Sequence, residues 1–376
     1  MAYGEVGSDL ELIKWETDYW TEYVRESGFK PYMGSGANAI IKTHRELVDG
    51  GKDLIVPLVG SLKGRGTGAG QLTGREEAAD TFAFRIRPFW RRNAIAVKKS
   101  AQKKAAIDVL KANKDGLKIW STDTMREEMI DAFSHVAIAD SRYNEDDGYG
   151  RGVPYTEATP TQRNNFLTDN SRRVLFGISE ANLSAGNFAT SLGNVDTTAD
   201  KWSAGMVDRL KDMARRRNRA AGQRAIRPYR NGANGKEFFV LFVPTRAFND
   251  LRADADIKAF NKDDRPRDVE ENPAFQGGDL MWNGVIIHEE PDLPILSGVG
   301  NSNCDVAPGY LCGAQALCVG WGQDPISTKR SDDDYGFITG VGTEELRSID
   351  KTFFASSSAV GPGEQFGCMS GYGAVA

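Results

Sequence analysis

Long apolar runs are missing from this chain of 376 residues, and their absence argues against a membrane-spanning helix. A spanning helix needs roughly 18 or more consecutive apolar residues, and no stretch here approaches that length. The first residues, MAYGEVGSDLELIKWE, also lack the basic start and apolar centre of a secretory signal. We therefore expect a protein that is made and kept inside a cell.

Histidine and cysteine are scarce, which leaves little material for acid–base or metal chemistry. No H-E-x-x-H, G-x-S-x-G or C-x-x-C motif occurs among the three histidines, the serines and the four cysteines. A metal or acid–base role for His288, beside two glutamates, is less favoured than a solvated strand end. No catalytic, cofactor-binding or metal-binding residue is expected. We interpret the cysteines as reduced, partly buried thiols, at Cys304, Cys312, Cys318 and Cys368.

The order of helical and strand patterns favours an α+β fold, because it shows no regular β-α-β alternation. Before residue 50 we expect an extended arm with a loop and a short helix containing His44. The segment 101–137 predicts two helices, with Gly116 ending the first and a Thr124-x-x-Glu127 capping box starting the second. Residues 140–200 are polar and predict loops.

The second half of the chain alternates between apolar strands and amphipathic helices. Residues 202–213 predict a helix, 236–243 predict a fully apolar strand, and a further helical pattern follows Pro244. Strands and turns are expected from there to residue 354. The Ser- and Gly-rich tail from Ala355 shows no core signal of its own.

Glycines cluster inside the segment 54–97, LIVPLVGSLKGRGTGAGQLTGREEAADTFAFRIRPFWRRNAIAV. A Gly-rich turn after an apolar run suggests a phosphate-binding loop, but the Gly-Lys-Ser/Thr ending of such a loop is missing. A dinucleotide-binding turn opens a helix, whereas Phe82, Phe84 and Ile86 recur with the period of two that is typical of a strand. We therefore predict a long hairpin with the glycines between its strands.

Charged residues follow these glycines in a pattern that suits an interface between copies of the chain. Isolated surface ion pairs contribute only about 0–1 kcal/mol, whereas rows of opposite charge set the register and choice of partner across an interface. A long exposed hairpin would also be an aggregation hazard unless it lies over a neighbour. The predicted inter-subunit contacts are Gly64, Arg65, Gly66, Glu76, Glu77, Arg85, Arg87, Arg91 and Arg92.

A basic run over 215–227 is the strongest candidate for contact with nucleic acid or with an acidic seam between subunits. Cations at a helix C-terminus complement the helix dipole, which explains two or three arginines but not the six of this run. The net charge of −5, however, disfavours a protein whose main task is to hold nucleic acid. The candidate contacts are Arg215, Arg216, Arg217 and Arg219.

Several motifs, in a fixed order, resemble the major capsid proteins of tailed bacteriophages. In the hairpin these are V-P-L, L-x-G-x-G, L-x-G-x-E-E, a strand and R-N-A-I, at 56–58, 62–66, 72–77, 82–86 and 92–95. The C-terminal half adds FVLFVPTRAFNDLRAD, NPAFQGGDLMWNGVIIHEEPDLP, YLCGAQALCVGWG and DYGFITGVG with DKTFF. The similar segments cover most of 52–98 and 236–354, and their order makes the resemblance specific.

This resemblance implies the Hong Kong 97 fold, with a spine helix in the peripheral domain. Its parts would be an N-terminal arm at 1–51, an extended hairpin loop (E-loop) at 52–98, a peripheral domain at 99–224 with a loop-rich segment at 140–200, an axial domain at 225–320, return strands to the peripheral domain at 321–354, and a C-terminal tail at 355–376.

The resemblance also implies a function without catalysis. The chain would assemble with itself into hexamers and pentamers of an icosahedral head that encloses double-stranded DNA. Assembly would take place in the host cytoplasm and the product would be part of the virion. Scaffolding, portal and decoration proteins are further expected partners, with packaged DNA on the inner face and no membrane. From the residues alone, two other classes stay open: an enzyme with a Gly-rich cofactor loop, and a nucleic-acid-binding protein that uses 215–227.

Overall fold

The computed structural model describes most of the chain as two compact units. The described residues are 28–51, 53–59, 62, 64, 66–77, 81–104, 109–137, 152–217, 224–231, 237–263, 279–333, 335, 337–354 and 363–375. Among them, the first unit comprises 90–125 and 324–345, and the second comprises 28–89, 126–323 and 346–375. None of the helices in this described part combines the length and apolar character needed to cross a membrane.

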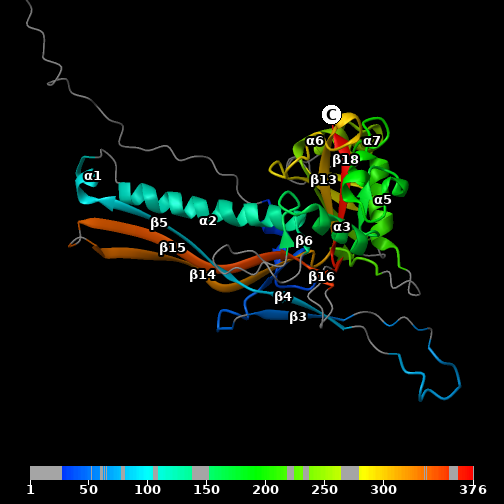
Figure 1. Cartoon of the computed structure of the whole chain (residues 1–376), viewed down its shortest axis with the longest axis horizontal. Coiled ribbons are helices and arrows are strands. Elements are labelled where there is room, and N and C mark those ends of the chain that lie inside the picture. Colours follow the sequence, from blue (N-terminus) through cyan, green and yellow to red (C-terminus); the bar gives the residue numbers. More distant parts are fainter. Residues whose placement is uncertain are drawn as a thin grey trace, which may run out of the picture. The chain divides into compact units, whose positions relative to one another are not determined.

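The first unit pairs a helix with three long strands. It holds α1 (Lys99–Lys104), the start of α2 (Val109–Ser134), and parts of β5 (Phe89–Lys98), β14 (Leu317–Asp333) and β15 (Ile338–Lys351). The strands lie in the order β14-β15-β5, and α2 runs alongside them (Figure 1). Gly342 on β15 leaves room for side chains of the two neighbouring strands. A methyl group at this position would come within 2.8 Å of Thr328 Oγ1 on β14 and 3.2 Å of Ala94 Cβ on β5.

Helix α2 corrects the prediction of two helices over this segment. Gly116 lies inside one continuous helix, and Thr124 does not start a new one. A glycine costs about 1 kcal/mol in a helix interior relative to alanine. That cost is outweighed here because the helix is anchored by buried apolar side chains, including Leu117, Met129 and Phe133.

The second unit is built on a mixed sheet in the order β11-β12-β10-β13-β18-β8, with β9 paired to β10. The predicted apolar strand is β10, and it pairs in parallel with β12 and antiparallel with β13. Figure 1 shows α5, α6 and α7 around β13 and β18. The bounds are β8 (Val174–Phe176), β9 (Arg230–Asn231), β10 (Glu237–Val243), β11 (Leu280–Trp282), β12 (Val285–Glu289), β13 (Asp305–Cys312), β18 (Cys368–Val375), α5 (Ala204–Arg215), α6 (Thr245–Ala253) and α7 (Ala255–Asp263).

The C-terminal strand β18 corrects the prediction of a tail without core signal. All eight of its residues are buried, and it lies between β13 and β8 in the sheet. Gly371 and Gly373 leave space for Trp202, whose ring atoms lie within 3.2 Å of where their methyl groups would be. Trp202 is 2% exposed and donates its Nε1–H to the carbonyl of Ala307 at 3.2 Å. Its glycines give the strand a weakly apolar sequence, and the apolar contact at these positions comes from Trp202 instead.

Two further segments of the second unit are more ordered than the sequence predicted. His44 lies in strand β2 (Ile41–His44), which pairs in parallel with β1 (Met33–Gly34) and β14, and not in a helix. The described part of the loop-rich segment contains the helices α3 (Pro160–Asp169) and α4 (Phe188–Gly193). Helix α3 begins at a capping box in which Thr159 and Gln162 exchange hydrogen bonds of 2.8 and 3.3 Å.

The remaining elements of the second unit are short. They are η2 (Lys30–Tyr32), β3 (Leu54–Val59), β4 (Thr81–Ile86), β6 (Val136–Ala137), β7 (Gly152–Val153), η4 (Glu180–Asn182), η6 (Asn301–Asn303), β16 (Phe353–Phe354) and β17 (Glu364–Gln365).

Candidate assembly surfaces

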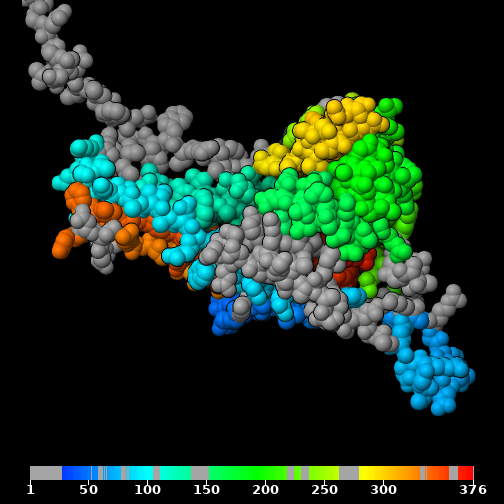
Figure 2. Space-filling model, viewed as in Figure 1, coloured from blue at the N-terminus to red at the C-terminus, as the bar shows by residue number. Residues whose placement is uncertain are grey.

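The predicted hairpin is present in the second unit. Strands β3 and β4 pair antiparallel, with Leu54 opposite Ile86 and Val59 opposite Thr81, so the glycines lie between two strands as expected. Figure 2 shows the described loop residues 66–77, in blue, projecting from the rest of this unit. At its base, Phe84 and Ile86 are buried in the core. The base of the hairpin is therefore packed into the core of the second unit, whereas its loop is exposed.

Both glutamates of the loop are exposed and hold backbone amides. Glu77 accepts a hydrogen bond from the Gly64 amide at 2.7 Å, and Glu76 accepts one from the Gly74 amide, also at 2.7 Å. Gly74 has a φ of +82°, in the region that favours glycine. The carboxylates thus shape the loop while their side chains lie at its surface. Arg65 lies outside the described residues.

Arg85 of β4 and Arg87, just after that strand, share one carboxylate within the second unit. Arg87 donates two hydrogen bonds to the carboxylate of Asp53, at 2.6 and 3.0 Å. The side chain of Arg85 is 38% exposed and lies 3.9 Å from the same carboxylate. Arg87 is therefore committed to its own chain, whereas Arg85 is more available to a neighbour.

The other two predicted arginines belong to the first unit. The side chain of Arg92 is 71% exposed and lies 3.5 Å from Glu344. Arg91 is half-buried. Of these two, Arg92 is the better placed to contact a neighbouring molecule.

Apolar side chains accompany the charges on the hairpin. Ile55 on β3 and Leu62 and Leu72 in the loop are each more than half exposed, at 53%, 55% and 59%. Large apolar groups exposed on a projecting loop are typical of a surface that another molecule covers. These three apolar residues were not among the inter-subunit contacts predicted from the sequence.

The basic run contacts acidic residues of its own chain. Arg215 lies 2.5 Å from Glu237, and Arg216 lies 2.6 Å from Asp212 and 2.8 Å from Glu180. The arrangement follows from α5, which ends at Arg215 and places these arginines beside η4 and β10. Of the other two candidates, Arg217 is exposed, and Arg219 lies outside the described residues.

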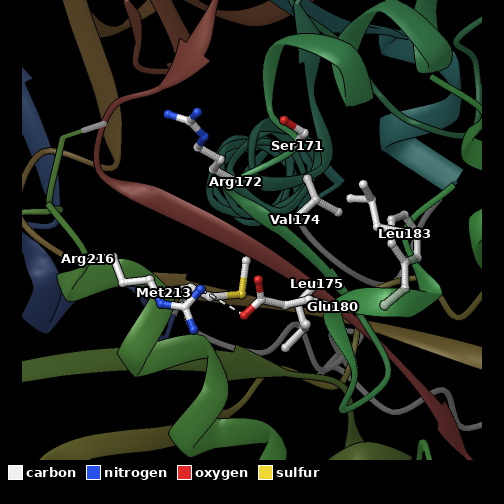
Figure 3. A pocket seen from close by; sticks show the side chains of 9 residues that line it. Ser171, Arg172, Val174, Leu175, Glu180, Leu183, Met213 and Arg216 are labelled. Atoms are coloured by element: carbon white, nitrogen blue, oxygen red, sulfur yellow. Dashed lines mark ion pairs between the residues drawn. The ribbon is translucent and has the colours of Figure 1, made fainter. Parts of the chain in front are cut away.

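A hollow of about 240 Å³ lies beside Arg216, lined by residues of β8, η4 and α5 (Figure 3). The carboxylate of Glu180 is paired with Arg216 at this site and lies 3.7 Å from Arg209. Two cations thus flank the one carboxylate, and its charge is compensated within the chain. The hollow therefore offers no uncompensated acidic group to a ligand.

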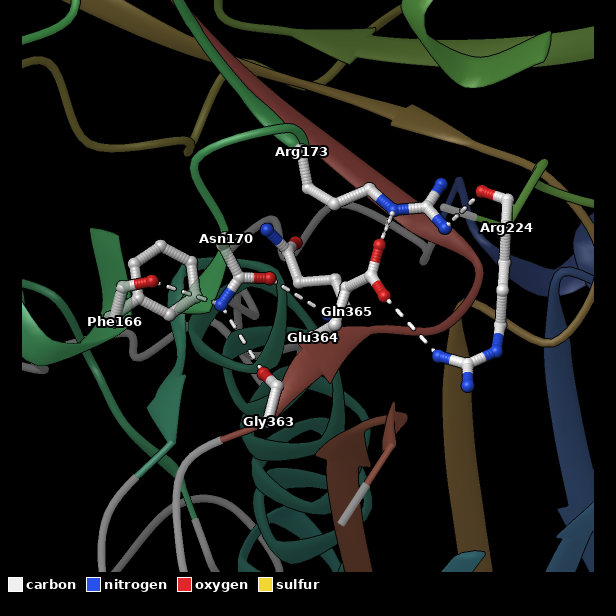
Figure 4. A network of polar contacts seen from close by, with 7 residues as sticks. All are labelled: Phe166, Asn170, Arg173, Arg224, Gly363, Glu364 and Gln365. Atoms are coloured by element: carbon white, nitrogen blue, oxygen red, sulfur yellow. Dashed lines mark hydrogen bonds and ion pairs between the residues drawn. The ribbon is translucent and has the colours of Figure 1, made fainter. Parts of the chain in front are cut away.

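Arg224 joins a buried polar network that sequence reasoning missed (Figure 4). Glu364 accepts a hydrogen bond from Arg173 at 2.9 Å and lies 3.6 Å from Arg224. Arg173 is 2% exposed and also donates to the Arg224 carbonyl at 2.6 Å. The guanidinium of Arg224 lies over two rings, Phe82 of β4 and Phe354 of β16. No local pattern signals this, because the partners are far apart in the chain.

Asn170 completes the other side of the same network. Its amide nitrogen donates to the carbonyls of Phe166 and Gly363, and its oxygen accepts from the Gln365 amide at 2.8 Å. Buried polar groups are costly unless they are satisfied, so these bonds fix β17 against α3.

His288 is not a solvated strand end, which corrects that expectation. Its Nδ1 lies 2.6 Å from Asp279, its side chain is 18% exposed, and its ring packs edge-on against Tyr32 and Phe242. Burial opposes the charged form, but the hydrogen bond and the charges of Asp279, Glu290 and Glu289 raise the pKa of His288 above its ordinary value. Within the described residues, no group of three or more His, Cys, Asp or Glu side chains is placed to hold a metal ion.

The family model described as phage capsid protein matches residues 4–375, and the chain therefore belongs to the phage capsid protein family. The major capsid protein of Pseudomonas phage KPP25 is 26% identical to it, over 95% of this chain and 93% of that protein. A chain of the cyanophage Pam1 capsid asymmetric unit matches with a TM-score of 0.85 and 29% identity, over 100% of both chains. The Ralstonia phage GP4 capsid shares the fold, with a TM-score of 0.71 and 22% identity over 98% and 97% of the two chains. The predicted fold class, α+β of the Hong Kong 97-like phage capsid type, is confirmed.

Proposed function

We propose that this chain is the major capsid protein of a phage and self-assembles into the shell of the head. The observation that carries this function is the full-length structural match to a chain of the cyanophage Pam1 capsid, at 29% identity. Family membership over 4–375 supports it independently. The role is structural, and we propose no enzymatic activity for the chain.

The hairpin supplies the physical support for self-association. It projects from its unit and carries exposed apolar side chains together with Glu76, Glu77 and Arg85. Burial of apolar surface favours association, and opposite charges set the register. We propose that the hairpin lies over a neighbouring copy of this chain, where Gly64 and Gly66 permit close approach of the backbones.

The finer assignments follow from the same proposal. The hairpin would be the E-loop, α2 the spine helix of the peripheral domain, and β10 to β13 part of the axial domain. Subunits would form hexamers and pentamers of an icosahedral head around double-stranded DNA. Scaffolding, portal and decoration proteins would be further partners in the host cytoplasm before the virion is complete.

The basic run is a weaker candidate for DNA contact than its sequence suggests. Arg215 and Arg216 are already paired with carboxylates, so each would exchange an existing ion pair for a phosphate. A slightly acidic subunit also fits a container that must release its DNA, because affinity for DNA rises with the number of phosphates neutralised. Arg217, near the start of this run, is exposed and is our candidate for contact at the inner face.

Expression of the chain by itself tests the function. We expect shells, tubes, sheets or hexamer-sized rings by size-exclusion chromatography and negative-stain electron microscopy. If only monomers form, the scaffolding protein from the same source is added. A folded chain that stays monomeric in both conditions contradicts the proposal, and reopens the class of enzymes with a Gly-rich cofactor loop, to be tested by ligand-dependent thermal stabilisation.

A further inference from the structure

The second unit contains a pair of buried thiols that its assembly function does not use. Cys312 ends β13, Cys368 begins β18, and the two residues are direct partners in the register of these antiparallel strands. Both side chains are fully buried, and the two sulfur atoms lie 3.9 Å apart. All four cysteines of the chain are free thiols in this structure.

The backbone geometry around this pair is suited to a covalent bond. The amide of Gly313 donates to the carbonyl of Gly367, one residue beyond the cysteines on each strand. That bond makes Cys312 and Cys368 a non-hydrogen-bonded pair, in which the Cα atoms of an antiparallel ladder come to about 4.5 Å. Disulfides span Cα separations of about 4.4–6.8 Å. The sulfurs therefore need only a change of side-chain rotamers to reach bonding distance.

A buried lysine accompanies the two thiols. Lys351 is 1% exposed, and its Nζ lies 5.4 Å from the ring centroid of Tyr310, two residues before Cys312 on β13. Burial opposes ionisation of Cys368, but the hydrogen bond from Cys312 and the charges of Lys351 and Arg173 lower the pKa of its thiol. Burial raises the pKa of the Cys312 thiol. The hydrogen bond runs from the Cys312 thiol to the Cys368 sulfur, and this geometry makes Cys312 the donor and assigns the first attack to Cys368.

We propose that Cys312 and Cys368 form a site of oxidative modification, where a peroxide converts the two thiols into a cross-strand disulfide. The Cys368 thiolate attacks one peroxide oxygen, which breaks the O–O bond, releases hydroxide and leaves a sulfenic acid. The Cys312 sulfur then attacks the Cys368 sulfur and displaces that oxygen, which leaves as water with the Cys312 proton. Two electrons pass from the sulfurs to the peroxide, which is reduced.

The bond joins the C-terminal strand to the sheet that surrounds it. It closes a long stretch of chain, and the stabilisation expected from a disulfide grows with the length of the closed loop. The reducing interior of a cell keeps such thiols free, whereas release into an oxidising medium favours the bond. The chemistry does not depend on the proposed capsid role, although that role would supply the move from one medium to the other.

Counting thiols in the full chain tests this site. The purified native protein is treated with hydrogen peroxide and then denatured in the presence of an alkylating reagent, which labels every free thiol. Intact mass gives the number of labelled thiols, and peptide mapping without reductant identifies any linked pair. We expect a loss of two of the four alkylatable thiols, a single linked peptide joining 312 to 368, and restoration by reductant. The unfolding temperature of the oxidised chain should rise by several degrees and return on reduction.

Matched variants separate this pair from the other thiols. Cys312→Ala and Cys368→Ala should each abolish the linked peptide and the reversible thermal shift, whereas Cys318→Ala should retain both. The inference is overturned if the untreated and treated chains expose the same number of thiols. It is equally overturned if the linked peptide contains Cys304 or Cys318, or if oxidation yields sulfinic or sulfonic acids without a disulfide.

Discussion

The guanidinium of Arg224 lies 4.7 Å from the ring centroid of Phe82. Phe82 belongs to β4 and Arg224 to the end of the basic run, so one contact joins the loop end of β4 to a residue far along the chain. The same guanidinium lies 4.6 Å from the ring centroid of Phe354, and its Nη1 lies 3.6 Å from the Glu364 carboxylate. Arg224 thereby anchors β4 of the hairpin to the rest of the second unit, and its positive charge is paired with Glu364 of the same chain.

Replacing Arg224 by Met should destabilise the chain by about 1–3 kcal/mol. The change keeps much of the side-chain length but removes a partly buried cation that lies over two rings and faces a carboxylate. Urea unfolding of the unassembled chain measures the loss, and hydrogen exchange over 81–86 should accelerate. Arg227→Met, at an exposed position, is the control. Equal midpoints for the two variants would contradict the proposed role of Arg224.

Reversing Glu76 and Glu77 to Lys should leave a folded chain that fails to assemble. The tip would then present repelling charges to any partner that the carboxylates attract. A double neutral variant, Glu76→Gln with Glu77→Gln, keeps an acceptor for the Gly64 and Gly74 amides and should assemble better than the reversal. Circular dichroism checks folding and electron microscopy checks shells. Shells of normal yield from the charge reversal would refute an interface at this loop.

Ending the chain after Gly367 should abolish folding. The truncation removes β18 and leaves β13 and β8 without their shared neighbour and Trp202 without the glycines it covers. The apolar burial lost is large against a typical stability of about 5–15 kcal/mol. We expect insoluble protein or loss of the cooperative unfolding transition. A chain ending after Val375 is the control and should fold. A soluble, cooperatively folded truncation would show that β18 is dispensable.

His288 should make stability depend on pH. Its pKa is raised in the folded chain, so its contribution is fully present below the unfolded value of about 6.5 and is lost as the pH rises through the folded value. The wild type should therefore lose stability relative to His288→Gln between about pH 6 and pH 8. Asp279→Asn removes the hydrogen-bonded carboxylate and should reduce that pH dependence, although Glu289 and Glu290 remain nearby. Urea unfolding across this pH range measures the effect. Parallel stability curves for wild type and His288→Gln at every pH would contradict this assignment.

Local patterns were sufficient for the elements whose signal lies in neighbouring residues. The alternation at 82–86 predicted β4, the apolar run at 236–243 predicted β10, and the ordered motifs predicted the capsid fold. The same local reasoning failed at Gly116, because packing along α2 outweighs the helix cost of one glycine. It also failed at His44, whose strand exists through pairing with β14.

The sequence by itself determined an α+β chain with a hairpin whose strands, glycines and charges are adjacent along the chain. Only the tertiary structure decided which charges are already paired, because Arg224 meets Phe82 and Glu364 across long separations. It also decided that β18 is core, since its glycines resemble a tail until Trp202 is seen to cover them. Burial and pairing depend on residues that distant parts of the chain bring together, and a local window of sequence does not contain them.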